Sequence, residues 1–492
     1  MTGFSYDFPY PSRRVPVMAR NVVATSQPLA AQAGLRMLLK GGNAVDAALA
    51  AAIALTVVEP TGNGLGSDAF AILWDGNRLH GLNASGRSPA AWTPERFRDL
   101  REMPRLGWES VTVPGAVSAW TLLSERFGRL PFEDLFEPAL DYARNGFHVS
   151  PTIALLWARA ATQLAGQPGF AEAFLPAGRA PRAGGLFVNR PVGDSLEAIA
   201  LSRGEDFYRG MLAERIAGFA REHGAALDAD DLGRHRASWC GTISSRFRDV
   251  ALHEIPPNGQ GIAALMALGM LETTGIDTLP PDGAEALHLQ IEAMKLALAD
   301  VERHVGDPAD MEVAVEHLLD PGYLAGRAAL IDPARAAEPR AGAPRDGGTV
   351  YVTAADADGM MVSYIQSNYN GFGSGVVVPG TGISLQNRGA GFTLEPGYPN
   401  RVGPAKRPFH TIIPGFLMRD GEPLMSFGLM GGPMQAQGHL QMVLRTQAWG
   451  QNPQTASDAP RWRVVKGREV AVEATMDAAA VAGLRARGHL VV

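Results

Sequence analysis

The stretch that constrains this chain most begins with the step Asp346-Gly347-Gly348-Thr349. An apolar run, 350–353, follows it, and the pair Asp358-Gly359 separates that run from a second one, 360–364. An Asp-Gly pair between two such runs predicts a two-stranded antiparallel hairpin. The two glycines permit backbone conformations that a β-carbon would forbid. The sequence therefore predicts a strand that opens on a threonine.

Thr349 is a candidate nucleophile. A hydroxyl group is a weak nucleophile unless a base lies beside it, and cleavage of the peptide bond before Thr349 would supply one, its own α-amino group. A free α-amino group has a pKa of about 8, so a useful fraction is neutral at physiological pH. The alternative is that Gly-Gly-Thr only begins a strand.

The composition is that of a soluble globular protein with a sizeable core: 492 residues, 46% hydrophobic and 19% charged. A net charge of −6 gives no basic footprint, so we expect no nucleic-acid partner. Cys240 is the single cysteine. It cannot form an internal disulfide, the chain has no Cys/His metal-binding pattern, and we expect a buried small hydrophobe.

The sequence predicts no membrane anchor. No apolar run follows a basic region near the start, which argues against a signal peptide. The apolar segment 47–58 is too short to cross a bilayer. The expected location is the cytoplasm.

Local patterns predict several elements. Asn43 is expected to cap a helix, with Asp46 favouring its first turn. The predicted elements are a strand over 15–24, helices over 26–40 and 44–56, a hairpin of 69–74 with 78–82, a mostly helical stretch over 151–240, a helix opening after 256–261, and another over 288–301.

Residues 333–348 are the one clear linker-like stretch, rich in Ala, Pro, Gly and Arg and poor in large apolar groups. Such a composition buries little, so we expect it to be exposed or mobile. It lies where a tail would have to be free to leave after cleavage before Thr349. The alternative is a plain surface loop.

Several sequence words occur in an order that resembles the γ-glutamyltransferase family, whose members are N-terminal-nucleophile hydrolases. These words are Gly42–Ala47, Glu59–Gly66, Val111–Gly115, Asn368–Gly375, Gly380–Asn387, Gly403–Pro408 and Gly428–Gly432. The resemblance runs from about residue 15 to the end. A glycine-rich loop such as 59–66 is also typical of phosphate binding, but no Gly-Lys-Ser/Thr ending follows it.

The resemblance implies an α+β fold, the four-layer αββα sandwich, in a single domain over 1–492. It also implies self-cleavage between Gly348 and Thr349, which gives a large subunit, 1–348, and a small subunit, 349–492. The chemistry implied is amide hydrolysis through an acyl-Thr349 intermediate, or transfer of the acyl group to an amine, with no metal and no cofactor. The partners implied are a small-molecule amide and the two subunits themselves, with a homo-oligomer of such heterodimers left open.

By the same resemblance, Gly431 and Gly432 match the pair that binds the oxyanion. Glycines let two backbone N–H groups point at one spot. Their alternative is a turn before a helix that starts near Gln435. Ser367 falls where the family has a second threonine beside the nucleophile's amino group, and its hydroxyl can hold or relay a proton.

The substrate pocket departs from the family. The arginine that holds a γ-glutamyl carboxylate is replaced by Ser85, and Arg87 is displaced by two residues. The acidic pair that follows the Asn-Asn word is missing, and the run here begins Asn387-Arg388. The positive charge of Arg388 would repel an ammonium group.

Three further positions belong to this candidate pocket. Tyr369 replaces a family asparagine, and His410 and Thr411 follow Phe409 in place of paired serines. With the acids lost and basic groups retained, the sequence favours a small anionic amide over a γ-glutamyl compound. This resembles the branch of oxamate amidohydrolases and cephalosporin-acylase-like proteins.

Three alternatives stay open. One is a γ-glutamyltransferase or glutathione hydrolase acting on γ-glutamyl compounds. Another is an uncleaved, non-catalytic binding or assembly subunit. In the third, His410 is the base for a different nucleophile, although the chain has no Gly-x-Ser-x-Gly elbow. Family members continue for a few dozen residues beyond the point that corresponds to Val492, so we expect a shortened chain.

Overall fold

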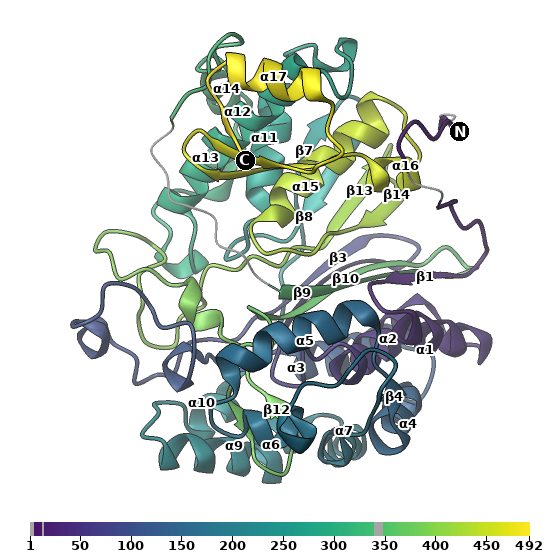
Figure 1. Ribbon diagram of the computed structural model, residues 1–492, viewed down its shortest axis with the longest axis vertical. Helices are drawn as coiled ribbons and strands as arrows, with labels where there is room; N and C mark the ends of the chain where they lie inside the picture. The colour runs from purple at the N-terminus through teal and green to yellow at the C-terminus, as the bar shows by residue number, and fades with distance from the viewer. Residues whose placement is uncertain (1–3, 12–13, 339–347) are drawn as a thin grey trace.

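A computed structural model describes residues 4–11, 14–338 and 348–492. The central part of the predicted linker, 339–347, lies outside the described residues. Two β-sheets face each other and helices cover their outer sides, giving the layers α, β, β, α (Figure 1). The expected αββα sandwich is therefore confirmed.

The first sheet has the order β1 (Val22–Thr25), β9 (Gly348–Ala355), β10 (Met361–Tyr369), β2 (Asp68–Trp74), β3 (Leu79–Ala84), β6 (Ser238–Trp239). The second has the order β14 (Glu422–Phe427), β13 (Gly415–Arg419), β8 (Val250–Glu254), β7 (Ile243–Phe247). All the pairings within these two sheets are antiparallel. Both sheets contain strands from before and after Thr349.

One helical layer covers the first sheet. It comprises α1 (Pro28–Leu39), α2 (Ala44–Val58), α3 (Ala116–Phe127), α4 (Glu137–Asn145), α5 (Pro151–Leu164), α6 (Phe170–Phe174), α7 (Arg190–Ser202), α8 (Glu205–Arg209), α9 (Met211–Glu222) and α10 (Ala229–Arg234). The short pairs β4 (Phe147–His148) with β5 (Leu186–Phe187), and β11 (Val377–Val378) with β12 (Ile383–Ser384), accompany it.

The other layer covers the second sheet. It comprises α11 (Gly261–Leu271), α12 (Ala284–His304), α13 (Val315–Leu318), α14 (Pro321–Ala328), α15 (Met434–Val443), α16 (Pro453–Asp458) and α17 (Ala478–Ala486). A small sheet of β15 (Trp462–Lys466), β16 (Glu469–Val472) and β17 (Leu490–Val491) lies at this end of the molecule (Figure 1).

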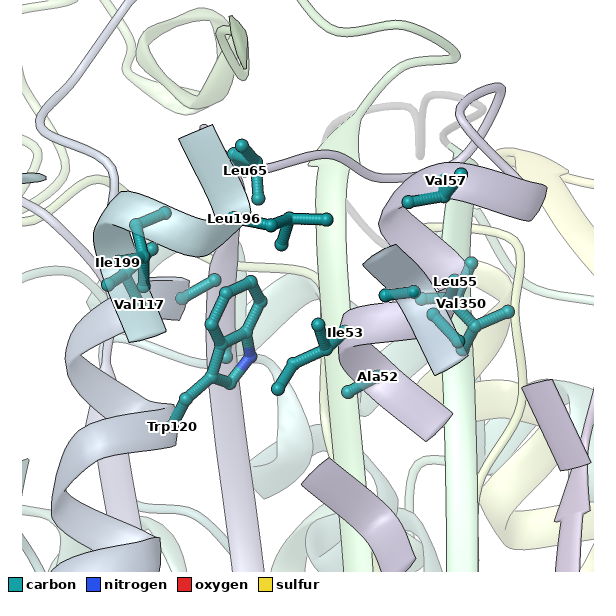
Figure 2. Close-up of a cluster of buried hydrophobic side chains, with 14 of the residues drawn as sticks. Ala52, Ile53, Leu55, Val57, Leu65, Val117, Trp120, Leu196, Ile199 and Val350 are labelled. Atoms are coloured by element: carbon teal, nitrogen blue, oxygen red, sulfur yellow. The ribbon is translucent and has the colours of Figure 1, made fainter. Parts of the chain in front are cut away.

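Helix α2 forms the centre of the first helical layer. All of its residues are buried, and alanines make up much of its length, so neighbouring elements can approach it closely. Its N-terminus has the capping box expected from Asn43 and Asp46. In Figure 2, Ile53 lies near Trp120 of α3, and Leu55 lies beside Val350 of β9. The strand that carries Thr349 therefore rests on a fully packed helix.

The side chains of β9 alternate between two cores. Val350 and Val352 belong to the core beneath the first sheet. Tyr351 belongs to the core between the sheets, with Phe70 and Phe416. Because successive side chains of a strand point to opposite faces, Thr349 shares the inter-sheet face with Tyr351.

The predicted hairpins and helices are present, with shifted ends. The expected strand over 15–24 was mostly wrong, since β1 covers only Val22–Thr25. Val22 pairs with Ala355, the last residue of β9, so the preceding residues have no strand left to pair with.

Cys240 is half-buried beside the inter-sheet core, and burial raises its pKa to about 11. Within the described ranges, no helix is both long and apolar enough to cross a membrane.

Candidate functional site

Thr349 lies near the start of β9 with 5% of its surface exposed. Its hydroxyl donates to Ser367 Oγ at 3.5 Å. It accepts a hydrogen bond from Gln435 Nε2 at 3.2 Å. Ser367 belongs to the neighbouring strand β10, and Gln435 to the first turn of α15. The candidate nucleophile is thus held between the two halves of the sandwich.

An irregularity in β10 brings Ser367 to this position. The pairing of β10 with β9 shifts register between Gln366 and Tyr369. Beyond the shift, Tyr369 pairs with Gly348, the residue before the predicted cut. Tyr369 has φ +77°, an unusual value for a residue with a β-carbon, and its N–H donates to Ser367 Oγ at 2.8 Å. Bulges of this kind re-aim side chains beside functional sites.

Gly431 and Gly432 form the turn between β14 and α15. Their φ angles are +116° and +56°, values that favour glycine. Their carbonyls accept from the backbone N–H groups of Met434 and Gln435 and so begin the helix. Neither glycine N–H donates to any residue that the structure describes. The pair therefore forms the turn that begins α15 and leaves two backbone N–H groups without a partner among the described residues.

The glycine loop 59–66 packs against β9, the strand that carries Thr349. A β-carbon on Gly62 would lie 3.3 Å from the carbonyl oxygen of Thr349. The carbonyl of Gly62 accepts the N–H of Asn368 at 3.1 Å. Gly64 and Gly66 of the same loop lie against Ser384 and Leu385, so close packing explains the glycines without a phosphate.

Arg388 is fully buried beside this arrangement. Its Nη1 donates to Thr411 Oγ1 at 2.9 Å, and its guanidinium lies over the ring of Tyr369, 4.2 Å from the centroid. Burial lowers its pKa to about 10, a value that still leaves it charged at neutral pH. Three of the predicted pocket residues are thereby brought together.

His410 pairs with a residue that sequence reasoning missed. Its Nε2 lies 3.1 Å from Asp68 Oδ2, and both side chains are fully buried. Burial raises the pKa of Asp68 to about 7, although the nearby charge of Arg388 opposes the rise. Burial, reinforced by Arg388 and Arg407, lowers the pKa of His410 well below its ordinary value. The histidine is therefore neutral at physiological pH.

Two predicted pocket residues have other partners. Arg87 forms an ion pair with Asp307 at 2.8 Å and donates to the carbonyl of Ala405, and its side chain is 46% exposed. Asn387 is buried and its amide ties Arg105 and Asn370 together. The geometry does not join Arg87 to Arg388 or Thr349.

A cavity of about 450 Å³ opens beside the site. Tyr369 and Thr411, the two partners of Arg388, line it together with Gln260 and Pro433. Gln260 Nε2 donates to the carbonyls of Thr411 and Gly432, so it links the arginine pocket to the glycine turn. A larger apolar cavity of about 900 Å³ lies farther along β9, against Tyr351 and Thr353. Thr349 and Arg388 are among the lining residues of neither cavity.

Three residues of the site escaped the sequence analysis: Gln435, Gln260 and Asp68. Gln435 is 86 positions from Thr349, and Asp68 is 342 positions from His410. The packing of the two halves of the sandwich brings these distant residues together. The available signal was local, because Gln435 closely follows Gly431-Gly432 and Asp68 follows the glycine loop.

One group of side chains within the described ranges has metal-ligand geometry: His288, Glu292 and His489, all buried. His288 Nδ1 lies 2.8 Å from His489 Nε2. Lys295 Nζ donates to Glu292 Oε1 at 2.7 Å, which places a cation on the carboxylate oxygen that a metal would need. The group is better explained as a polar anchor for the backbone at Asp332 and Ala337, which accept from His288 and Lys295.

Known proteins share the fold and much of the sequence of this chain. The family model described as gamma-glutamyltranspeptidase matches residues 30–492. The glutathione hydrolase-like YwrD proenzyme of Bacillus subtilis is 36% identical over 96% of this chain and 93% of its own length. The oxamate amidohydrolase proenzyme of Klebsiella pneumoniae is 35% identical over 96% of this chain and 91% of its own. The crystal structure of a cephalosporin acylase from Bacillus halodurans superposes with a TM-score of 0.94 at 47% identity, covering 99% of this chain and 92% of that one.

Proposed function

The chain belongs to the γ-glutamyltranspeptidase family of hydrolases and acyltransferases, and from that premise we propose that it is a self-processing amidohydrolase whose nucleophile is Thr349. Cleavage before Thr349 would yield a heterodimer of residues 1–348 and 349–492. The relatives that carry the name proenzyme support this maturation.

The observation that carries the proposal is the environment of the Thr349 hydroxyl. Ser367 and Gln435 orient it. The turn that leads to Gln435 contains two N–H groups that donate to no described residue. In the uncleaved chain, attack of this oxygen on the carbonyl carbon of Gly348 would transfer the acyl group from nitrogen to oxygen. Water would then hydrolyse the ester and leave a free α-amino group on Thr349.

The same atoms would then act on substrate. The α-amino group takes the proton of Thr349 Oγ1 as the oxygen attacks the amide carbon. The N–H groups of Gly431 and Gly432 donate to the oxyanion of the tetrahedral intermediate. The proton passes to the departing amine, and water attacks the acyl-threonine to release the acid. Transfer to a second amine would follow the same path.

The substrate we propose is a small amide without a γ-glutamyl group, such as oxamate. The acids that would hold a γ-glutamyl ammonium are missing from the run after Asn387, and a buried arginine stands there instead. A buried cation strongly disfavours a second cation beside it. The 35% identity to an oxamate amidohydrolase supports this choice.

The first test is a denaturing mass spectrum of the wild type, of Thr349→Ala and of Thr353→Ala. Thr353 is the matched control, because it lies on the same face of β9 and its hydroxyl bonds Ser426 instead of the site. We expect two fragments that break before Thr349 in the wild type and in Thr353→Ala, and one intact chain in Thr349→Ala. A single intact mass for all three proteins would contradict self-processing and favour a non-catalytic subunit.

The second test measures hydrolysis of oxamate beside γ-glutamyl-p-nitroanilide. We expect ammonia release from oxamate and little release of p-nitroaniline. Rapid turnover of the γ-glutamyl compound with none of oxamate would instead make the protein a glutathione hydrolase, the activity named for an Escherichia coli relative that is 30% identical.

A further inference from the structure

We propose that Arg388 is the anchor for a carboxylate group on the substrate, and that the enzyme therefore selects short amides that also carry a free carboxylate. This inference rests on the proposed amidohydrolase function and adds the class of substrate and the residue that selects it.

The guanidinium of Arg388 is incompletely satisfied. Nη1 donates to Thr411, but Nε and Nη2 are buried and have no hydrogen-bond partner among the described residues. No carboxylate in the described part of the chain forms an ion pair with it. A buried charge without a partner is costly, and unpaired donors on one require an explanation. A ligand that supplies the missing acceptors is such an explanation.

The two unpaired donors have the geometry of a carboxylate site. Nε and Nη2 lie on one edge of the planar guanidinium, and their N–H bonds point the same way. A carboxylate accepts both in the bidentate arrangement that arginine forms best. The Cζ of Arg388 lies over the ring of Tyr369, 4.2 Å from its centroid, and this contact helps to hold the guanidinium in place.

Shared contacts connect the anchor to the reaction centre. Thr411 and Tyr369, which contact Arg388, line the same cavity as Pro433, the residue after the glycine turn. The N–H of Tyr369 donates to Ser367, whose Oγ accepts from Thr349. An acid held at Arg388 would therefore place its amide toward the nucleophile and the oxyanion donors.

Cleavage would also ease access to the anchor. Nε and Nη2 are shielded from solvent in the uncleaved chain, where Tyr369 pairs with Gly348 across the ladder. Cutting after Gly348 releases that residue from the chain of β9. The cavity wall formed by Tyr369 would then lose its pairing partner, which would ease the entry of an anion.

The charges around the cavity favour one orientation. Glu102, Glu302 and Glu395 line it and outnumber Arg101, which also lines it, so most of the charged wall repels a carboxylate. The carboxyl group of Asp68 interacts electrostatically with Arg388, but it is hydrogen-bonded to His410. Burial raises the pKa of Asp68 to about 7. Near pH 6 it is largely protonated and leaves the charge of Arg388 uncompensated.

Matched substrates that differ only in charge test the anchor. We would measure kcat/KM for oxamate against oxamide, malonamate against malonamide, and succinamate against succinamide, with the matured wild type, Arg388→Gln and Arg388→Lys. We expect the wild type to prefer the acid in at least one pair. Arg388→Gln should lower that preference about 10- to 100-fold, because a charged, bidentate hydrogen bond is lost. Arg388→Lys should retain part of it, since the charge remains without the fork.

Arg445→Gln is the control variant. Arg445 is also buried, but its guanidinium is bonded to Asp282, Gln451 and the carbonyl of Pro460. It should lose stability, measured as thermal unfolding, and keep the acid preference. Maturation of each variant is read from its denaturing mass.

The outcomes separate the two proposals. A wild type that neither cuts itself nor hydrolyses any amide contradicts the proposed function. A wild type that hydrolyses amides but prefers the neutral member of every pair overturns the anchor. The anchor is also overturned if Arg388→Gln or Arg388→Lys keeps the full acid preference of the wild type.

Discussion

At the scale of single residues, the Thr349 hydroxyl depends on two side chains that are far from it in sequence. Ser367 lies 18 positions away and Gln435 lies 86 positions away. Gln435 has a second task, because its Oε1 accepts the backbone N–H of Ile413 at 3.0 Å. One buried amide therefore links Thr349, the proposed nucleophile, to the second half of the sandwich.

We expect Gln435→Leu to lower kcat/KM for amide hydrolysis by about 10- to 100-fold, because the donor to Thr349 Oγ1 is lost. It should also destabilise the fold by about 1–3 kcal/mol, since the N–H of Ile413 is left buried and unpaired. Steady-state kinetics and chemical denaturation measure the two effects.

Gln437→Leu is the control, because Gln437 is a buried amide of the same helix that bonds the backbone of Val464. It should lose stability and keep its activity. Equal losses of activity in both variants would mean that helix packing alone explains the effect of Gln435.

Asp68 should make stability depend on pH. Burial raises its pKa from 3.8 to about 7, so the folded protein holds its proton more tightly than the unfolded chain does. This contribution to stability is complete below about pH 4 and is lost as the pH rises to about 7. We expect the wild type to lose stability relative to Asp68→Asn across that window. Melting temperatures of both proteins from pH 4 to pH 9 test it, and a constant difference would contradict the assignment.

The sequence alone identified Thr349, Ser367, Arg388 and the glycine turn as candidates, because family words and local chemistry mark them. It also placed Arg87 in the pocket, yet that side chain pairs with Asp307, 220 positions away. The partners of these residues, such as Asp68 for His410, depend on the packing of two sheets. The spacing of apolar residues along the sequence does not indicate contacts between residues that are so far apart in the chain.

At the scale of elements, close approaches between backbone and side chain set the position of the site. Gly428 follows β14, and a β-carbon there would lie 2.3 Å from the ring of Tyr351 on β9. Since Tyr351 is fixed in the core between the sheets, it has little room to move.

We expect Gly428→Ala to destabilise the protein by about 1–3 kcal/mol, the usual range for overpacking a core. The contrasting variant is Gly326→Ala in α14, where nothing lies within 4 Å of the added carbon. That change should be neutral or stabilising by up to about 1 kcal/mol, because alanine favours a helix over glycine. Denaturant unfolding compares them, and equal effects would refute the steric argument.

Elements with local signals were predictable. The Asp-Gly turns mark the β2–β3 and β9–β10 hairpins, and the capping box at Asn43 marks the start of α2. The bulge of β10 at Ser367 was not predictable, because it depends on the pairing of Tyr369 with Gly348. The predicted strand over 15–24 was too long for the same reason, because the length of a strand is set by the strand with which it pairs.

At the scale of the whole molecule, the proposed cut does not divide the architecture. In the first sheet β1, β2 and β3 precede Thr349 while β10 follows it, and in the second sheet β8 pairs with β13. Each fragment would contribute strands to both sheets and residues to the core between them.

We therefore expect the two fragments to migrate as one particle after cleavage. Size-exclusion chromatography in native buffer should give a single peak containing both, and the fragments should separate only in strong denaturant. Because the fragments share backbone hydrogen bonds as well as buried apolar surface, dilution should not dissociate them. Separate elution under native conditions would contradict this.

The position of β9 has a consequence for how the proposed catalytic amine would be formed. Strand β1 pairs with β9 only from Val352 onward, and at Thr349 the neighbours of β9 are β10 and the glycine loop 59–66, so the new chain end forms in a buried position. A chain synthesised with Thr349 as its first residue would have to insert a charged terminus between two neighbours and hold it there during folding. Making the end after folding removes that difficulty, so the peptide bond acts as a scaffold that is discarded once the sheet has closed.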